Sequence, residues 1–161
     1  MSDQADALYG AEDSVALDRL RQFQRFAEVQ QAIDDIVLSD WWAEMFPEAP
    51  VEVQVFRRSR SARFSVAQAR LDEDAGAVFI RDGSWDLVTV LHELAHIATV
   101  SVVAHSGSDT RRAALQRDPH NEDFVGVLLL FWQEWAGFHN YGELRSVLDV
   151  HGVAYHLPRR G

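Results

Sequence analysis

The sequence contains no cysteine and no lysine, so all of its 15 basic residues are arginine. The absence of cysteine excludes disulfides, thiolate nucleophiles, iron–sulfur clusters and cysteine-ligated zinc. The absence of lysine excludes P-loop nucleotide hydrolases and enzymes that form a Schiff base through lysine. Any metal ion would therefore have to be held mainly by histidine, aspartate or glutamate.

Positive charge is also scarce: 25 acidic residues give a formal net charge of −10. Such a chain repels nucleic acids and anionic membranes on average. The longest apolar run, Phe124 to Trp132, is too short to span a bilayer, and the polar, acidic stretch from Met1 to Asp6 does not resemble a secretory signal. We therefore expect a cytoplasmic protein with no membrane partner.

Length and composition favour one globular domain, since 161 residues with 47% apolar content can bury a core. We predict a disordered leader over residues 1–11 and a single domain over residues 12–161. Apolar spacing and turn residues predict a set of elements. They are one long amphipathic helix over 12–38 or two with a break, strands over 51–56, 64–71 and 77–80, apolar helices over 85–104 and from about 120 to 136, and a short helix over 140–150. The fold class expected is α+β, with a small antiparallel or mixed three-stranded sheet packed on the helices.

An HExxH motif, His92-Glu93-Leu94-Ala95-His96, lies inside the predicted apolar helix over 85–104. Residues i and i+4 lie one helical turn apart on one face, so both imidazoles can reach one ion. Glu93 is rotated by about 100° from His92, which suits a general base better than a ligand. The alternative is two core histidines hydrogen-bonded to neighbours and a glutamate paired with an arginine.

A catalytic metal site needs a third protein ligand, and we favour His120 at the start of the next predicted helix. Glu122, Asp123 and His105 are the alternatives, and His120 could instead be a solvated residue near a helix cap. Asp118, Asp123 and Glu134 are candidates for orienting a ligating histidine. Candidates for a further hydrogen-bond donor to a reacting oxygen lie downstream: His139, Tyr141, Tyr155 and His156.

This part of the chain, about residues 84–132, resembles small gluzincin-type zinc metallopeptidases. It is similar to the SprT-like family, in which HExxH is followed by His-Gly-x-x-Phe; here His120 and Phe124 match and Asn121 stands in place of glycine. It also resembles the ImmA/IrrE family, whose third ligand lies four residues before a phenylalanine, and small metallohydrolases of actinobacteria and their phages. The resemblance implies a minimal zincin-like fold, Zn²⁺ as cofactor and a peptide or protein substrate.

In zincins an edge strand ahead of the motif helix pairs with an extended peptide, and residues 77–80 are a candidate for that strand. A short edge strand that binds nothing is equally compatible with the pattern. Four arginines form a basic cluster flanked by phenylalanines: Arg57, Arg58, Arg60 and Arg63. We favour a solvated turn over a nucleic-acid contact for this cluster, so nucleic acid is not an expected partner.

The sequence thus predicts a zinc-dependent hydrolase, most plausibly a peptidase. Zinc held by His92, His96 and His120 would activate water, and Glu93 would act as general base. The alternative is a non-catalytic, metal-stabilised regulatory or interaction module, although structural zinc sites are usually rich in cysteine. A third hypothesis is a nucleic-acid-associated protein that works through the arginine cluster.

Overall fold

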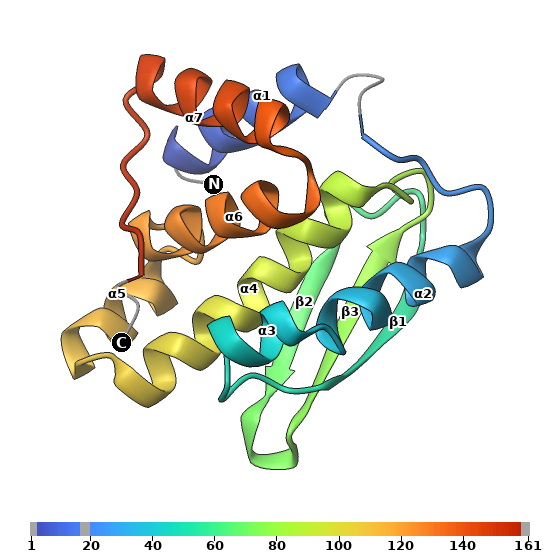
Figure 1. The fold of residues 1–161 in the computed structure, drawn as a ribbon, viewed down its shortest axis with the longest axis horizontal. Helices are drawn as coiled ribbons and strands as arrows, with labels where there is room; N and C mark the ends of the chain where they lie inside the picture. Colours follow the sequence, from blue (N-terminus) through green and yellow to red (C-terminus); the bar gives the residue numbers. More distant parts are fainter. Residues whose placement is uncertain (1–2, 17–19, 159–161) are drawn as a thin grey trace. The chain divides into compact units, whose positions relative to one another are not determined.

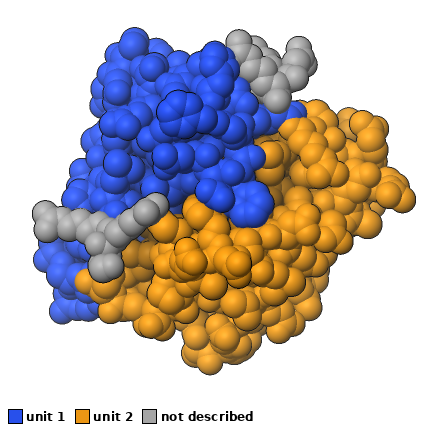
Figure 2. All heavy atoms as spheres, in the orientation of Figure 1, with its two compact units in different colours: residues 1–20, 107–161 blue, residues 21–106 orange. Residues whose placement is uncertain are grey.

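The computed structural model describes residues 3–16 and 20–158, and within them the chain is an α+β protein (Figure 1). Contacts divide it into two compact units, residues 1–20 with 107–161, and residues 21–106 (Figure 2). We describe each unit separately. The single domain over 12–161 remains a prediction.

The unit of residues 21–106 contains the sheet and the helix that carries the HExxH motif. Its elements are α2 (Phe26–Val37), α3 (Asp40–Met45), β1 (Glu52–Arg58), β2 (Val66–Arg70), the short 3-10 helix η1 (Leu71–Glu73), β3 (Ala75–Arg81) and α4 (Leu87–Ser106). The strands and α4 lie close to the predicted ranges. The predicted helix over 12–38 is interrupted, because α2 begins only at Phe26; residues 17–19 lie outside the described residues.

The sheet is mixed, with strand order β1-β3-β2. β3 runs parallel to β1, with Val55 opposite Val78, and antiparallel to β2, with Ala67 opposite Val78. Strand β3 is therefore central, and the prediction that residues 77–80 form an edge strand is wrong. The backbone N–H and C=O groups of β3 pair with β1 on one side and with β2 on the other, so β3 has no unpaired edge.

One face of the sheet is buried and the other is not. Burial alternates along β1 and β3, so that Val53, Val55, Val78 and Ile80 face the interior. Helices α2 and α4 supply the apolar side chains that cover the sheet. Helix α4 approaches β3 closely at Gly76, where an added β-carbon would lie only 3.1 Å from the Ile97 side chain.

Helix α4 is buried over most of its surface, as the apolar sequence predicts. Its first turn is capped by Asp86, whose Oδ1 accepts a hydrogen bond from the Thr89 N–H at 2.8 Å. Among the described residues, α4 is the one helix long and apolar enough to cross a membrane by length and composition. Because buried core helices pass the same test, this is weak evidence for a membrane span.

The other unit is helical. Its elements are α1 (Asp3–Ala16), α5 (Asp109–Arg117), α6 (Glu122–Trp135) and α7 (Phe138–Val150). Helix α1 occupies most of the region predicted as a disordered leader, because Ala5, Leu8, Ala11 and Val15 recur at helical spacing and are buried. Helix α5 lies in a stretch for which the sequence predicted neither a helix nor a strand, and the Ser108 side chain caps it by accepting from the Arg111 N–H.

Helix α6 is the core of this unit, with Phe124 to Leu129 all buried. Helix α7 packs against it, and α1 packs against α7. The chain after α7 returns to the start of α6, where the His156 N–H donates to the Glu122 carbonyl at 2.9 Å. Gly126 permits this approach, since a β-carbon there would lie 1.8 Å from the carbonyl oxygen of His156.

We predict that Gly126→Ala destabilises the protein by about 1–3 kcal/mol, because backbone atoms must move to admit the methyl group. The matched control is Gly142→Ala in α7, where no atom lies within 4 Å of the added carbon. That substitution should stabilise by about 0.5–1 kcal/mol through helix propensity. Urea denaturation measures both, and equal stabilisation by the two substitutions would contradict the packing of the C-terminal segment on α6.

Candidate metal centre

His92 and His96 are placed on one face of α4 by the helix itself. Their ring centroids lie 5.0 Å apart with an interplanar angle of 69°. His92 and the adjacent Glu93 are each only 3% exposed, and His96 is half-buried. Burial of such polar groups is costly unless each has a partner, which a shared ion would supply to the imidazoles.

His120 lies in the turn between α5 and α6, and several contacts fix its position. Its backbone N–H donates to Asp118 Oδ1 at 3.1 Å, and its carbonyl accepts from the Gln4 side chain at 3.1 Å. Its ring meets Phe124 edge-on, with centroids 5.1 Å apart. Asp118, a predicted orienting residue, thus acts on the backbone of His120.

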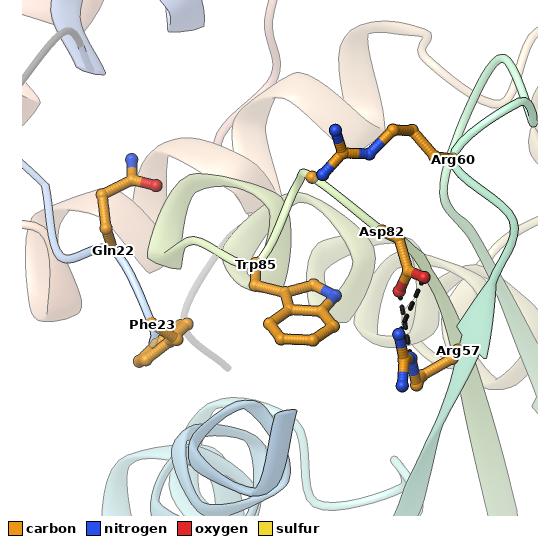
Figure 3. Close-up of a pocket in the computed structure, with 7 residues that line it drawn as sticks. Gln22, Phe23, Arg57, Arg60, Asp82 and Trp85 are labelled. Atoms are coloured by element: carbon orange, nitrogen blue, oxygen red, sulfur yellow. Dashed lines mark hydrogen bonds and ion pairs between the residues drawn. The ribbon is translucent and has the colours of Figure 1, made fainter. Parts of the chain in front are cut away.

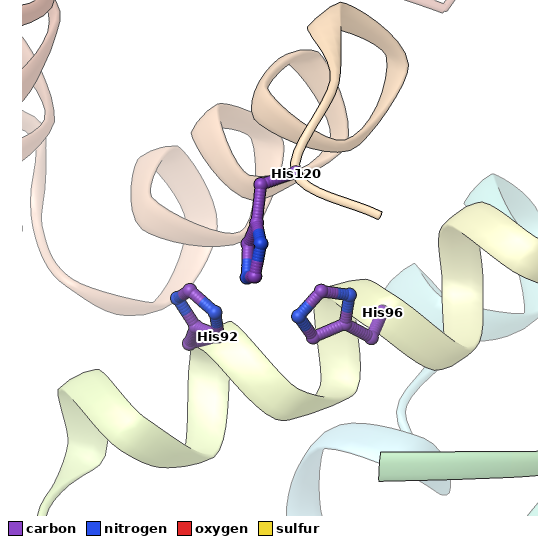
Figure 4. Close-up of side chains that lie close together, drawn as sticks. All are labelled: His92, His96 and His120. Carbon is purple, nitrogen blue, oxygen red and sulfur yellow. The ribbon is translucent and has the colours of Figure 1, made fainter. Parts of the chain in front are cut away.

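The three histidines each offer a ring nitrogen, and these atoms all lie within 4.8 Å of one another (Figure 4). Ring nitrogens around a tetrahedral zinc ion lie roughly 3.3 Å apart, given zinc–nitrogen distances of about 2.0–2.1 Å. Imidazole suits zinc, copper, iron and nickel, so the donor set fits a transition-metal ion. The described residues thus contain a histidine cluster that could hold a metal ion.

The alternative third ligands make other contacts. The Asp123 carboxylate forms a two-pronged ion pair with the Arg111 guanidinium, and the shortest nitrogen–oxygen distance is 3.1 Å. His105 hydrogen-bonds through Nδ1 to the Ser101 carbonyl at 2.9 Å. Glu122 is exposed in the first turn of α6. Within the described part of the chain, none of these side chains joins the histidine cluster.

Tyr9 of α1 is a neighbour of the site that the sequence analysis missed. Its hydroxyl lies 3.3 Å from His120 Nε2, and the two rings meet edge-on with centroids 5.3 Å apart. A hydrogen bond to a ring nitrogen restricts the orientation of an imidazole. The signal that could have found Tyr9 is the helical spacing of the buried residues Ala5, Leu8 and Val15 around it.

The predicted donors to a reacting oxygen have partners elsewhere in their own unit. The hydroxyls of Tyr141 and Tyr155 both accept from the Arg145 guanidinium, at 3.2 and 3.1 Å. These hydrogen bonds raise the pKa of Arg145 above its ordinary value, with that to Tyr155 the largest cause. His139 lies 2.9 Å from Glu143 on the exposed side of α7. These contacts give the three residues structural roles.

No protein-family model matches the chain, and neither a curated protein nor a solved structure is significantly similar to it.

We predict that the purified protein binds one zinc ion per chain and that His120→Ala weakens binding by roughly 100-fold or more. The reason is that the substitution removes one of only three imidazoles that would share the binding free energy of the ion. Calorimetric titration with Zn²⁺ measures the effect, and His139→Ala, on the exposed side of α7, is the matched control. Equal loss in both variants, or none in either, would contradict a role of His120 as ligand.

We also predict that Tyr9→Phe weakens zinc binding by about 10-fold, the lower end of what loss of a partner behind a ligating histidine costs. Tyr155→Phe removes a hydroxyl that contacts Arg145 and should leave zinc affinity unchanged. Competition with a chelator of known affinity gives both values. Unaltered affinity in Tyr9→Phe would show that the hydroxyl does not orient His120.

Proposed function

We propose that the chain is a zinc-dependent hydrolase with a peptide or protein substrate. The observation that carries this proposal is the cluster of His92, His96 and His120 next to the buried Glu93. Three histidine ligands leave a fourth position of a tetrahedral ion for water or substrate, which is the arrangement of catalytic sites. A zinc ion bound there would polarise a carbonyl group and lower the pKa of a water molecule to about 7.

In this proposal the chain's own residues divide the work. The three imidazoles hold the ion, and Tyr9 orients the ring of His120. Glu93 accepts a proton from the attacking water and then delivers it to the leaving nitrogen. A carboxylate beside a zinc-bound water would suit this role as a proton acceptor.

A peptide in extended conformation could add to the sheet through backbone hydrogen bonds. Strand β3 is central and has no free edge, so the strands available for addition among those described are β1 and β2. This revises the region that would bind substrate, while the proposed chemistry stays with the residues of α4.

We predict that Glu93→Gln retains its zinc but loses activity by about 10²–10⁴-fold, the usual contribution of a general base. Cleavage of a peptide mixture prepared from a proteome digest, read by mass spectrometry, would reveal activity without a known substrate. Glu44→Gln, an exposed carboxylate on α3, is the matched control and should cleave like the original chain.

The same experiment separates this proposal from the non-catalytic alternative. If the ion serves folding alone, chelation unfolds the protein while neither the original chain nor Glu93→Gln cleaves any peptide. Full activity of Glu93→Gln would remove Glu93 from the mechanism. Elemental analysis of both variants shows whether loss of activity follows loss of the ion.

A further inference from the structure

A second site candidate lies within the unit of residues 21–106, at the ends of β1 and β3 and the start of α4. It is a hollow of about 280 Å³ (Figure 3). The lining combines cationic, aromatic and amide groups: Gln22, Phe23, Arg57, Arg60, Asp82, Gly83 and Trp85. The wall formed by Gln22 and Phe23 is held by two backbone hydrogen bonds, Phe23 N–H to Trp85 O and Leu87 N–H to Arg21 O, each 2.9 Å long.

Arg57 is a structural member of this hollow. Its guanidinium donates two hydrogen bonds to the Asp82 carboxylate, at 3.1 and 2.9 Å. Its central carbon also lies 5.2 Å from the centroid of the Trp85 ring. The hydrogen bond from Arg57 holds the pKa of Asp82 below its ordinary value, so Asp82 is ionised at neutral pH and neutralises Arg57.

Arg60 is placed differently, because its guanidinium lies across Gly83. The guanidinium atoms are 3.7–3.9 Å from where a β-carbon of Gly83 would be. Gly83 has φ +96°, a conformation that favours glycine, so no side chain of residue 83 lies between this turn and the guanidinium. Within the described residues, the Arg60 guanidinium makes no ion pair, although it contributes to lowering the pKa of Asp82.

Two aromatic rings, Trp85 and Phe23, also line the hollow. The Trp85 ring is held by Phe26, with centroids 5.5 Å apart, as well as by Arg57. Phe23 is buried, and Arg21 lies over its ring at 4.9 Å. Aromatic walls of this kind bind planar apolar groups.

The charges that line the hollow are two guanidiniums and one carboxylate, so they sum to one positive charge in a chain of net charge −10. A single available guanidinium fork matches a planar carboxylate. The Asp82 carboxylate in the same lining disfavours a phosphate dianion. The lining therefore favours a monoanion attached to a flat group.

We propose that this hollow binds a carboxylate attached to an aromatic group, with Arg60 holding the carboxylate and Trp85 and Phe23 enclosing the ring. The carboxylate could belong to a small aromatic acid or to the C-terminus of a peptide that ends in an aromatic residue. The site gives a binding role to Arg60 and a structural role to Arg57, two residues of the arginine cluster for which the sequence favoured a solvated turn. It is independent of the metal ion.

The test uses the full chain and four probes, in two matched pairs. Benzoate and N-acetyl-Ala-Ala-Phe carry the carboxylate, and benzamide and N-acetyl-Ala-Ala-Phe amide lack its charge. Titrations followed by NMR, at the Gly83 amide and the Trp85 indole N–H, should show both carboxylates binding at least about tenfold more tightly than their amides. The tighter of the two carboxylates identifies the source of the ligand.

Arg60→Gln should weaken carboxylate binding by at least about tenfold, because it removes the charge-assisted fork. Arg63→Gln belongs to the same basic cluster but does not line the hollow, and it should bind as the original chain does. Three outcomes would overturn the proposal: no binding of either carboxylate at millimolar concentration, equal loss in both variants, or tighter binding of inorganic phosphate than of both carboxylates.

Discussion

The desolvation of His92 and Glu93 inside α4 is the constraint on which the interpretation of this protein depends. Each side chain is 3% exposed, in a helix whose other buried residues are mostly apolar. Removing such groups from water costs several kcal/mol unless they gain partners. A folded chain can keep them there only with contacts that compensate, and a metal ion shared by the three histidines could be one such contact.

The parts of the molecule that depend on local sequence pattern could be predicted. Alternating apolar residues such as Val53 and Val55 gave strand β1, and the continuous apolar surface of α4 gave a buried helix. The His120 side chain, near two helical histidines in the structure, was chosen from spacing alone. For β1 and α4 a short window of sequence contains the physical information.

The parts that depend on long-range pairing could not be predicted. Nothing local in residues 75–81 shows that β3 lies between β1 and β2, because strand order is decided by partners elsewhere in the chain. Helix α1 was missed because its apolar face is made of small side chains such as Ala5 and Ala11, which give a weak periodic signal. Tyr9 was not predicted as a site residue either, because only its contact with His120 in the folded protein links it to the site. Likewise, the sequence could not distinguish Arg60 from the other arginines of residues 57–63, because its place over Gly83 depends on the folded turn.

The discontinuous unit has a consequence for synthesis of the chain. Helix α1 precedes the uninterrupted stretch of residues 21–106 in the chain, and α7, against which α1 packs, follows it. The apolar stripe of α1 must therefore remain without this contact in the nascent chain until residues 138–150 have been made. Chaperones that bind exposed apolar segments have that whole interval in which to act, and the sheet unit has time to collapse before the helical unit closes.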